Sequence, residues 1–324
     1  MSSYFTRKKV KTKGEQYTTR KPVSPVDLTL TEMFERFMDI KKTEGLAKRT
    51  IDDHYLHFTY FCEFIQRDLK NEEITVEVFR DYIAYMLEER DLSPVTVNIR
   101  IRPLKAFLRY SHKAGYLNSP LHEDIKILKT PEDTIESLTP AEIKLILGQI
   151  DDRYYAGFRD KCVIFILLDT MVRISELLAI KRENVDLKQG TIKLEAHETK
   201  TKRARTVPIS SKTVNLLREY ISETEGYNNE LLFLSFNGDE LAANTVRRAL
   251  MTYARSAGIS KRVSPHTWRH TGALLYILNG GDPFSLQKIL GHADMSMVRK
   301  YIQMTNQDIK SQHNYFSPLK AVFK

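Results

Sequence analysis

Residues 264–270 read Ser-Pro-His-Thr-Trp-Arg-His. This stretch limits the possible folds and reactions of the 324-residue chain more than any other. Ser264 suits a helix cap and Pro265 the first helical position. His266 then falls in the first turn, with Arg269 three residues later on the same face. Backbone N–H groups at a helix start already favour an anion. An imidazole and a guanidinium at that corner therefore predict a phosphodiester site.

A metal site is the alternative interpretation of the same stretch. His266 and His270 are spaced i,i+4, but Thr267 stands where the helix of a zinc protease has glutamate. We therefore expect no metal and no cofactor, and we expect His270 to be a hydrogen-bonded core or supporting residue. A zinc-dependent hydrolase stays a rival interpretation, which loss of activity with a chelator would favour.

Two segments before this helix carry further charged groups. Arg173 and Glu176 share a helix face at i,i+3 spacing, which by itself also fits a surface ion pair. Two short β-like runs, 191–196 and 205–209, flank a turn rich in lysine and arginine. The tip of such a hairpin can reach into a groove or remain in solvent.

One segment after this helix completes the set. Gly291 is expected to end a helix, so that His292 lies in the turn before the next one. Tyr301 lies nine residues beyond His292, within that last helix. Among 16 tyrosines, packing is the ordinary role of any single one.

Composition indicates a globular protein with a basic arm. The chain has 50 Lys and Arg against 41 Asp and Glu, and its first 25 residues hold seven of the bases and one acid. Such an arm favours binding to a polyanion, with nucleic acid as the first candidate and an anionic membrane as the second. The alternative is a tail that only improves solubility. The longest apolar run, Cys162–Leu168, is too short to span a membrane. With two cysteines and no secretory signal, we expect a cytoplasmic protein without disulfides.

The periodicity predicts a mainly α protein with a small antiparallel sheet. Four amphipathic segments without strand signals follow the arm, and the hairpin and further helices come after a stretch without periodicity. The expected divisions are a flexible basic arm over 1–27, a helical domain over 28–114, a linker over 115–136, and a second domain with a C-terminal tail over 137–324.

Taken together, the four segments resemble the tyrosine recombinase (phage integrase) family. The matching groups, in chain order, are Arg173, Lys200, His266, Arg269, His292 and Tyr301. Two departures stand out: Met171-Val172 replaces the usual Gly-Leu, which can alter the local turn, and Trp268 replaces Leu. The resemblance implies a core DNA-binding domain followed by a catalytic domain.

The resemblance also implies how the strands are cut. Tyr301 is the nucleophile, and its attack on the scissile phosphate makes a 3′-phosphotyrosyl link and releases a 5′-hydroxyl. Lys200 is the general acid for that hydroxyl, with Lys202 as the alternative. His266 accepts the tyrosine proton. No metal or ATP is needed, because the ester keeps the bond energy.

The remaining implied roles are electrostatic. The guanidinium groups of Arg173 and Arg269, together with His292, bind the charge that develops on the non-bridging oxygens. Glu176 orients the site rather than transferring protons.

The implied partner is double-stranded DNA with inverted-repeat core sites. The resemblance implies self-assembly to a tetramer on two DNA sites through a Holliday junction, with accessory DNA-bending proteins possible. Phage integration, transposition as a mobile element, and chromosome or plasmid resolution all stay open. Rival functions are a type IB topoisomerase-like relaxing enzyme and a catalytically silent DNA-binding protein of the same fold. Leu319, Val322 and Phe323 give the tail a short apolar face, which docks on its own domain or, by resemblance, on a neighbouring protomer.

Overall fold

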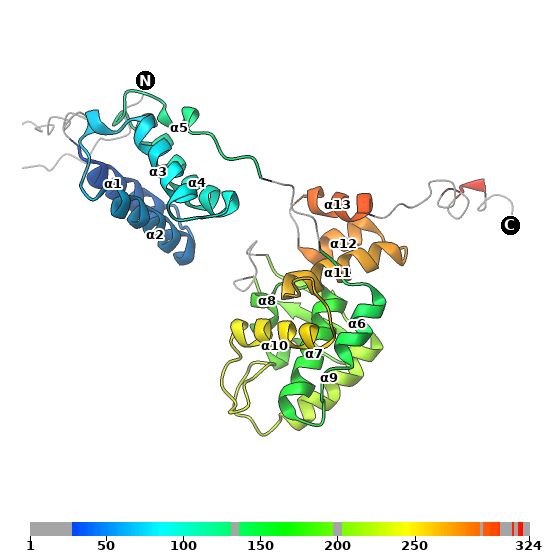
Figure 1. Cartoon of the computed structure of the whole chain (residues 1–324). Coiled ribbons are helices and arrows are strands. Elements are labelled where there is room, and N and C mark those ends of the chain that lie inside the picture. Colours follow the sequence, from blue (N-terminus) through cyan, green and yellow to red (C-terminus); the bar gives the residue numbers. More distant parts are fainter. Residues whose placement is uncertain are drawn as a thin grey trace, which may run out of the picture. The chain divides into compact units, whose positions relative to one another are not determined.

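The computed structural model is mainly helical with one small antiparallel sheet, which confirms the predicted fold class (Figure 1). The chain divides into two compact units, residues 1–132 and 133–324, each with an apolar core of its own. No helix among the described residues is long and apolar enough to cross a membrane. The residues that the structure describes are 28–130, 136–196, 203–291, 294–304, 313 and 317–319.

The first unit is a bundle of helices, coloured from blue through cyan to the green of α5 in Figure 1. Two of its longer helices, α1 and α4, begin at capping residues that the sequence supplies. Thr29 and Glu32 cap each other's backbone at the start of α1, and Ser93 accepts the N–H of Thr96 at the start of α4. The elements are α1 (Leu30–Thr43), α2 (Lys48–Ile65), the 3-10 helix η2 (Asn71–Glu73), α3 (Val76–Glu88), α4 (Pro94–Lys113) and α5 (Leu121–Asp124).

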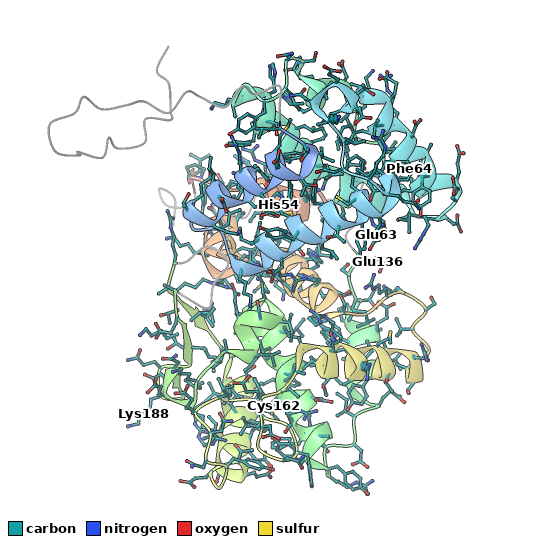
Figure 2. The ribbon with its side chains drawn as sticks, turned by 90° about the vertical axis from the view of Figure 1, so that its left-hand side faces the viewer. His54, Glu63, Phe64, Glu136, Cys162 and Lys188 are labelled. Carbon is teal, nitrogen blue, oxygen red and sulfur yellow. The ribbon has the colours of Figure 1, made fainter. Side chains whose placement is uncertain are left out.

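Aromatic side chains form the centre of this bundle. The ring of Phe34 in α1 stacks on Phe58 of α2, with 3.7 Å between ring centroids. Phe107 of α4 meets Phe34 edge-on at 5.5 Å. These contacts join three helices through side chains that each bury a large apolar area. His54, labelled in Figure 2, lies on the same helix as Phe58.

The segment predicted as a linker over 115–136 packs on the first unit as far as Leu128, which differs from that prediction. Tyr116, Leu121 and Ile125 are buried in the core of the first unit. Asn98 of α4 also bonds the backbone of Leu128 in both directions, with both distances 2.9 Å. Tertiary burial rather than helical periodicity holds this segment, so its sequence carries no periodic signal of its packing.

The second unit, green to red in Figure 1, surrounds the apolar helix α7. This helix packs against α9 and α11, and its Cys162 is completely buried (Figure 2). The elements are α6 (Pro140–Leu147), α7 (Tyr155–Thr170), α8 (Ile174–Leu178), the 3-10 helix η3 (Arg182–Asn184), β1 (Val185–Asp186), β2 (Thr191–Leu194), β3 (Arg205–Pro208), α9 (Ser211–Glu223), α10 (Ala243–Ser256), α11 (Pro265–Leu278), α12 (Pro283–Leu290) and α13 (Ser296–Met304).

The sheet has the order β1-β2-β3, with antiparallel neighbours. Leu194, the last residue of β2, pairs with Arg205, the first residue of β3. The sequence predicted β2 and β3. Strand β1 has only two residues, too few to show alternation, and was not predicted.

A close helix crossing and a small apolar cluster set the geometry of the C-terminal region. An ideal Cβ on Gly272 of α11 would lie 2.4 Å from the Leu168 carbonyl oxygen of α7, so glycine permits this approach. The cluster joins α11, α12 and α13, which lie together in Figure 1. Its buried members are Met171, Ala273, Ile277, Leu286, Leu290, Val298 and Tyr301.

Candidate active site

The loop that carries Arg173 begins with an unusual backbone turn. Met171 follows the last residue of α7 as its C-cap, and its φ of 54° lies in the left-handed region. Glycine adopts this conformation at less cost than other residues. Methionine occupies it here, and its side chain is buried in the cluster that contains Tyr301. The turn is thus made without the glycine that the resemblance led us to expect.

Arg173 then forms a capping box with a buried carboxylate. The Arg173 N–H donates to Glu176 Oε2 at 3.0 Å, and Arg173 Nη1 donates to Oε1 at 2.9 Å. The Glu176 side chain has no exposed surface, whereas the Arg173 side chain is 20% exposed. The alternative of a surface ion pair is therefore wrong. The carboxylate is an internal anchor, and the guanidinium reaches the surface.

Arg205, at the start of β3, donates to the same carboxylate. Its Nη2 lies 2.7 Å from Glu176 Oε2 and its Nη1 lies 3.2 Å from Oε1. Burial by itself raises the pKa of Glu176, but the hydrogen bonds from Arg205 and from the Arg173 N–H outweigh burial and lower the pKa. Glu176 is therefore an ionised carboxylate at neutral pH.

Helix α11 begins as the sequence predicted. Ser264 accepts the N–H of Thr267, and Pro265 occupies the first turn. His266 is exposed there. Loss of water around its ring, together with the positive charge of Arg269, lowers the pKa of His266, which favours the neutral imidazole.

Arg269 lies on the same helix but is turned inward. It is 4% exposed, donates through Nη1 to the Met171 carbonyl, and donates through Nη2 to the Leu290 carbonyl at 3.0 Å. Burial, reinforced by the like charge of Arg173, lowers the pKa of Arg269 to about 10. Arg269 thus stays charged at neutral pH and ties the loop after α7 to the end of α12.

Tyr301 lies in α13 and is completely buried. Its hydroxyl is 2.6 Å from Nδ1 of His270, and the two ring centroids are 5.9 Å apart. The histidine that contacts the predicted nucleophile is thus His270, which the sequence indicated as a supporting residue. The expected proton acceptor, His266, lies one turn earlier, with its ring centroid 6.5 Å from that of His270.

Both partners in this hydrogen bond are neutral at neutral pH. Burial, with help from nearby His266 and Arg269, lowers the pKa of His270 to about 4. Burial raises the pKa of Tyr301, and the charge of Arg269 opposes that rise. In the tautomer with its proton on Nε2, the His270 ring accepts the tyrosine O–H at Nδ1, and in the other tautomer Nδ1–H donates to the hydroxyl oxygen.

Three predicted site residues, Lys200, Lys202 and His292, lie outside the described residues. The described residues beside them are anchored at the site. Arg205, at one end of the segment that contains both lysines, binds Glu176. Before His292, the Leu290 carbonyl accepts from Arg269, and Gly291 ends α12 with a φ of 66°.

Sequence reasoning did not single out Arg205, nor the contact of His270 with Tyr301. For Arg205 a signal existed. Strand alternation places Arg205 on the same side as Val207, which is completely buried. For His270 no local signal existed, because its partner lies 31 positions away.

The described arrangement suits transfer of a phosphoryl group. It combines two arginines held by fixed acceptors with an exposed histidine and a tyrosine hydroxyl bound to His270, the neighbour of Arg269 in the chain. Such preorganised cations stabilise charge on phosphate oxygens without first having to reorient.

Family models match both units. The model of the phage integrase family matches residues 136–308, and that of the phage integrase SAM-like domain matches residues 29–127. Curated relatives include the tyrosine recombinase XerD of Listeria innocua, 26% identical over 297 residues that cover 89% of this chain and 98% of XerD. The tyrosine recombinase XerC of Chlamydia caviae is 24% identical, with 88% of this chain and 98% of that protein covered.

Solved structures share the fold. A lambda integrase dimer bound to a COC′ core site has a TM-score of 0.71 at 19% identity, with 88% of this chain and 80% of that chain covered. The Tn1549 transposon integrase in complex with transposon right end DNA has a TM-score of 0.72 at 20% identity, with 90% and 100% covered.

Proposed function

Since this chain belongs to the phage integrase family, we propose that it is a site-specific tyrosine recombinase, an enzyme that cuts and rejoins DNA strands. One observation carries the proposal. Arg269 donates to the Met171 carbonyl two residues before Arg173, and its neighbour His270 binds Tyr301. Groups from three distant segments, each suited to phosphodiester chemistry, thus gather around one helix.

The reaction uses Tyr301 as nucleophile. A bond forms between its phenolic oxygen and the scissile phosphorus, and the bond from phosphorus to the 5′-oxygen breaks. The tyrosine proton passes to a histidine, His266 in our assignment. Lys200, with Lys202 as the alternative, gives a proton to the leaving 5′-oxygen. Attack by a 5′-hydroxyl from the partner strand reverses these steps and releases Tyr301.

Arg173, Arg269 and His292 stabilise the transition state. Two guanidinium groups and one imidazole N–H face the non-bridging oxygens of the phosphate. These oxygens carry more negative charge in the transition state than in the ground state. Glu176 orients Arg173 from inside the protein. Its complete burial supports this role, because a buried carboxylate between two arginines is poorly placed to exchange protons with DNA.

The two units divide the work on DNA. Residues 28–114, with the segment up to Leu128 that packs on them, form the core DNA-binding domain. Residues 137–324 form the catalytic domain, and the basic arm over 1–27 adds contacts to the DNA backbone. Four protomers assemble on two core sites with inverted repeats and pass through a Holliday junction. The solved lambda integrase tetramer bound to a Holliday junction supports this assembly at the level of fold. The same proposal includes two further points. The recombinase serves a mobile element, and accessory proteins bend the DNA.

A nicked half-site that traps the covalent intermediate tests the proposal. The DNA comes from inverted repeats that flank the gene, and the nick lets the released strand diffuse away. We expect wild-type protein to form a covalent adduct that survives denaturing gel electrophoresis, and Tyr301→Phe to bind the same DNA without forming it. The matched control is Tyr315→Phe, at the next tyrosine along the chain, and this variant should form the adduct. An adduct that persists in Tyr301→Phe would assign the nucleophile elsewhere and contradict the proposal.

A further inference from the structure

We infer that Arg205 is a positioning residue of this active site, which holds both Arg173 and the turn before His292 in their working places. The inference rests on the function proposed above. Arg205 is the first residue of β3, and its side chain is 10% exposed. Its guanidinium donates to two segments that are far apart in the sequence, the one around Glu176 and the one around Ile289.

The first link runs to Arg173 through Glu176. Each carboxylate oxygen of Glu176 accepts one hydrogen bond from the Arg205 guanidinium and one from Arg173. Oε1 accepts from Arg205 Nη1 at 3.2 Å and from Arg173 Nη1 at 2.9 Å. Oε2 accepts from Arg205 Nη2 at 2.7 Å and from the Arg173 N–H at 3.0 Å. The buried carboxylate is thus bound on two sides and has little freedom to turn.

The charges of these three side chains explain why a second arginine is useful. Glu176 alone would neutralise Arg173, and the pair would offer little net charge to a phosphate. With Arg205 present, the cluster of two guanidinium groups and one carboxylate keeps one net positive charge. Arg173 is the more exposed of the two arginines, so that charge is available on its side.

The second link runs to the turn that precedes His292. Arg205 Nε donates to the Ile289 carbonyl at 3.0 Å. An ideal Cβ on Gly291 would lie 3.0 Å from the guanidinium carbon of Arg205, so the turn lies directly against this group. Gly291 also has a left-handed φ of 66°, which glycine accepts readily. One planar side chain therefore supports both ends of the phosphate site.

Lysine cannot replace this group. A single ammonium lacks the planar fork that meets two carboxylate oxygens and a carbonyl at once. Arg205→Lys keeps the charge and loses the geometry, whereas Arg205→Met removes both. Comparing the two variants separates the contribution of charge from that of position.

The test measures single-turnover cleavage of the nicked half-site by full-length protein, with DNA affinity and thermal melting measured in parallel. We expect both Arg205 variants to cleave on the order of 10²-fold more slowly at saturating DNA, because the phosphate-binding groups are misplaced. Their DNA affinity should stay close to that of wild type.

The matched control is Arg159→Lys. Arg159 likewise binds a carboxylate, of Asp160 at 2.8 Å, and a carbonyl, of Leu234 at 3.3 Å, outside the proposed catalytic set. Arg159→Lys should lower the melting temperature. It should leave the cleavage rate unchanged when that rate is measured well below the melting temperature.

A second substrate distinguishes positioning from a general loss of structure. A methylphosphonate at the scissile position lacks the negative charge that Arg173 and Arg269 bind. If Arg205 acts through Arg173, its variants should lose less rate on this neutral substrate than on the phosphodiester, and Arg173→Ala should show the same pattern. Arg159→Lys should keep the wild-type ratio of the two rates.

Two outcomes would overturn the inference while leaving the proposed function intact. One is wild-type cleavage by Arg205→Lys, and the other is an equal loss on both substrates. Absence of any Tyr301 adduct in wild-type protein would instead refute the proposed function, and this inference with it.

Discussion

The hydroxyl oxygen of Tyr301 lies 2.6 Å from Nδ1 of His270, and the tyrosine side chain has no exposed surface. In this arrangement the oxygen that should attack DNA is bound to a neutral imidazole inside the protein. Because Tyr301 is completely buried, attack on a phosphate requires its hydroxyl to become accessible to DNA. The bond should contribute both to the stability of the second unit and to the resting position of the nucleophile.

The strength of this bond can be measured with a double-mutant cycle. His270→Ala and Tyr301→Phe should each lower the stability of the second unit, since each leaves a buried polar partner unsatisfied at a cost of about 1–3 kcal/mol. The double variant should be more stable than the sum of the single losses predicts, by about 1 kcal/mol. Trp268 is the only tryptophan and is buried in the second unit, so its fluorescence reports this unfolding selectively. Strictly additive losses would show that the two side chains do not interact.

The depressed pKa of His270 predicts that acid weakens the second unit. In the unfolded chain the histidine takes up a proton near pH 6.5, whereas in the folded protein its pKa is about 4. Full stability is present above pH 6.5 and is lost as the pH falls toward 4, by up to about 1.4 kcal/mol per pH unit. Melting followed by Trp268 fluorescence should show a smaller loss between pH 7 and 5 in His270→Gln. An unchanged pH dependence in that variant would assign the effect to other groups.

The crossing of α11 over α7 should not tolerate a side chain at Gly272. An added Cβ would lie 2.4 Å from the Leu168 carbonyl oxygen and 2.8 Å from the Met171 side chain. Gly272→Ala should therefore push α11 away, with a loss of stability of about 1–3 kcal/mol and a larger loss of cleavage, because Arg269 lies on the displaced helix. Gly148→Ala is the matched control. Its nearest neighbour would be at 3.4 Å, and its stability should be unchanged. Equal behaviour of the two variants would contradict the close crossing.

A substrate with sulfur in place of the leaving 5′-oxygen tests the general acid. Because a thiolate leaves without protonation, Lys200→Ala should cleave normal DNA slowly and recover on the sulfur substrate. Lys202→Ala serves as the comparison and should show no selective recovery. Recovery in Lys202→Ala alone would transfer the role to that lysine.

The basic arm should contribute to the salt dependence of DNA binding. Each neutralised phosphate adds a slope of about −0.9 to the plot of log affinity against log salt concentration. Deletion of residues 1–25, which carry seven basic residues, should flatten that slope and leave the cleavage rate at low salt unchanged. An identical slope in the shortened protein would make the arm a solubility tail.

The sequence by itself predicted features that depend on residues close together in the chain. The cap at Ser264 and the proline at Pro265 predicted the start of a helix, and the structure has α11 from Pro265 to Leu278. The hairpin of β2 and β3 was predicted from alternation in two short runs. Caps, turns and periodicity act within one or two turns, so local sequence carries them.

Only the tertiary structure decided which partner each polar side chain binds. Arg205 meets Glu176 across 29 positions, His270 meets Tyr301 across 31, and Arg269 meets the Met171 carbonyl across 98. Each choice follows from burial, because a charged or polar group taken out of water must bind whatever donor or acceptor the fold places beside it. The sequence determined which chemical groups are available, and packing of α7, α11 and α13 decided how they are paired.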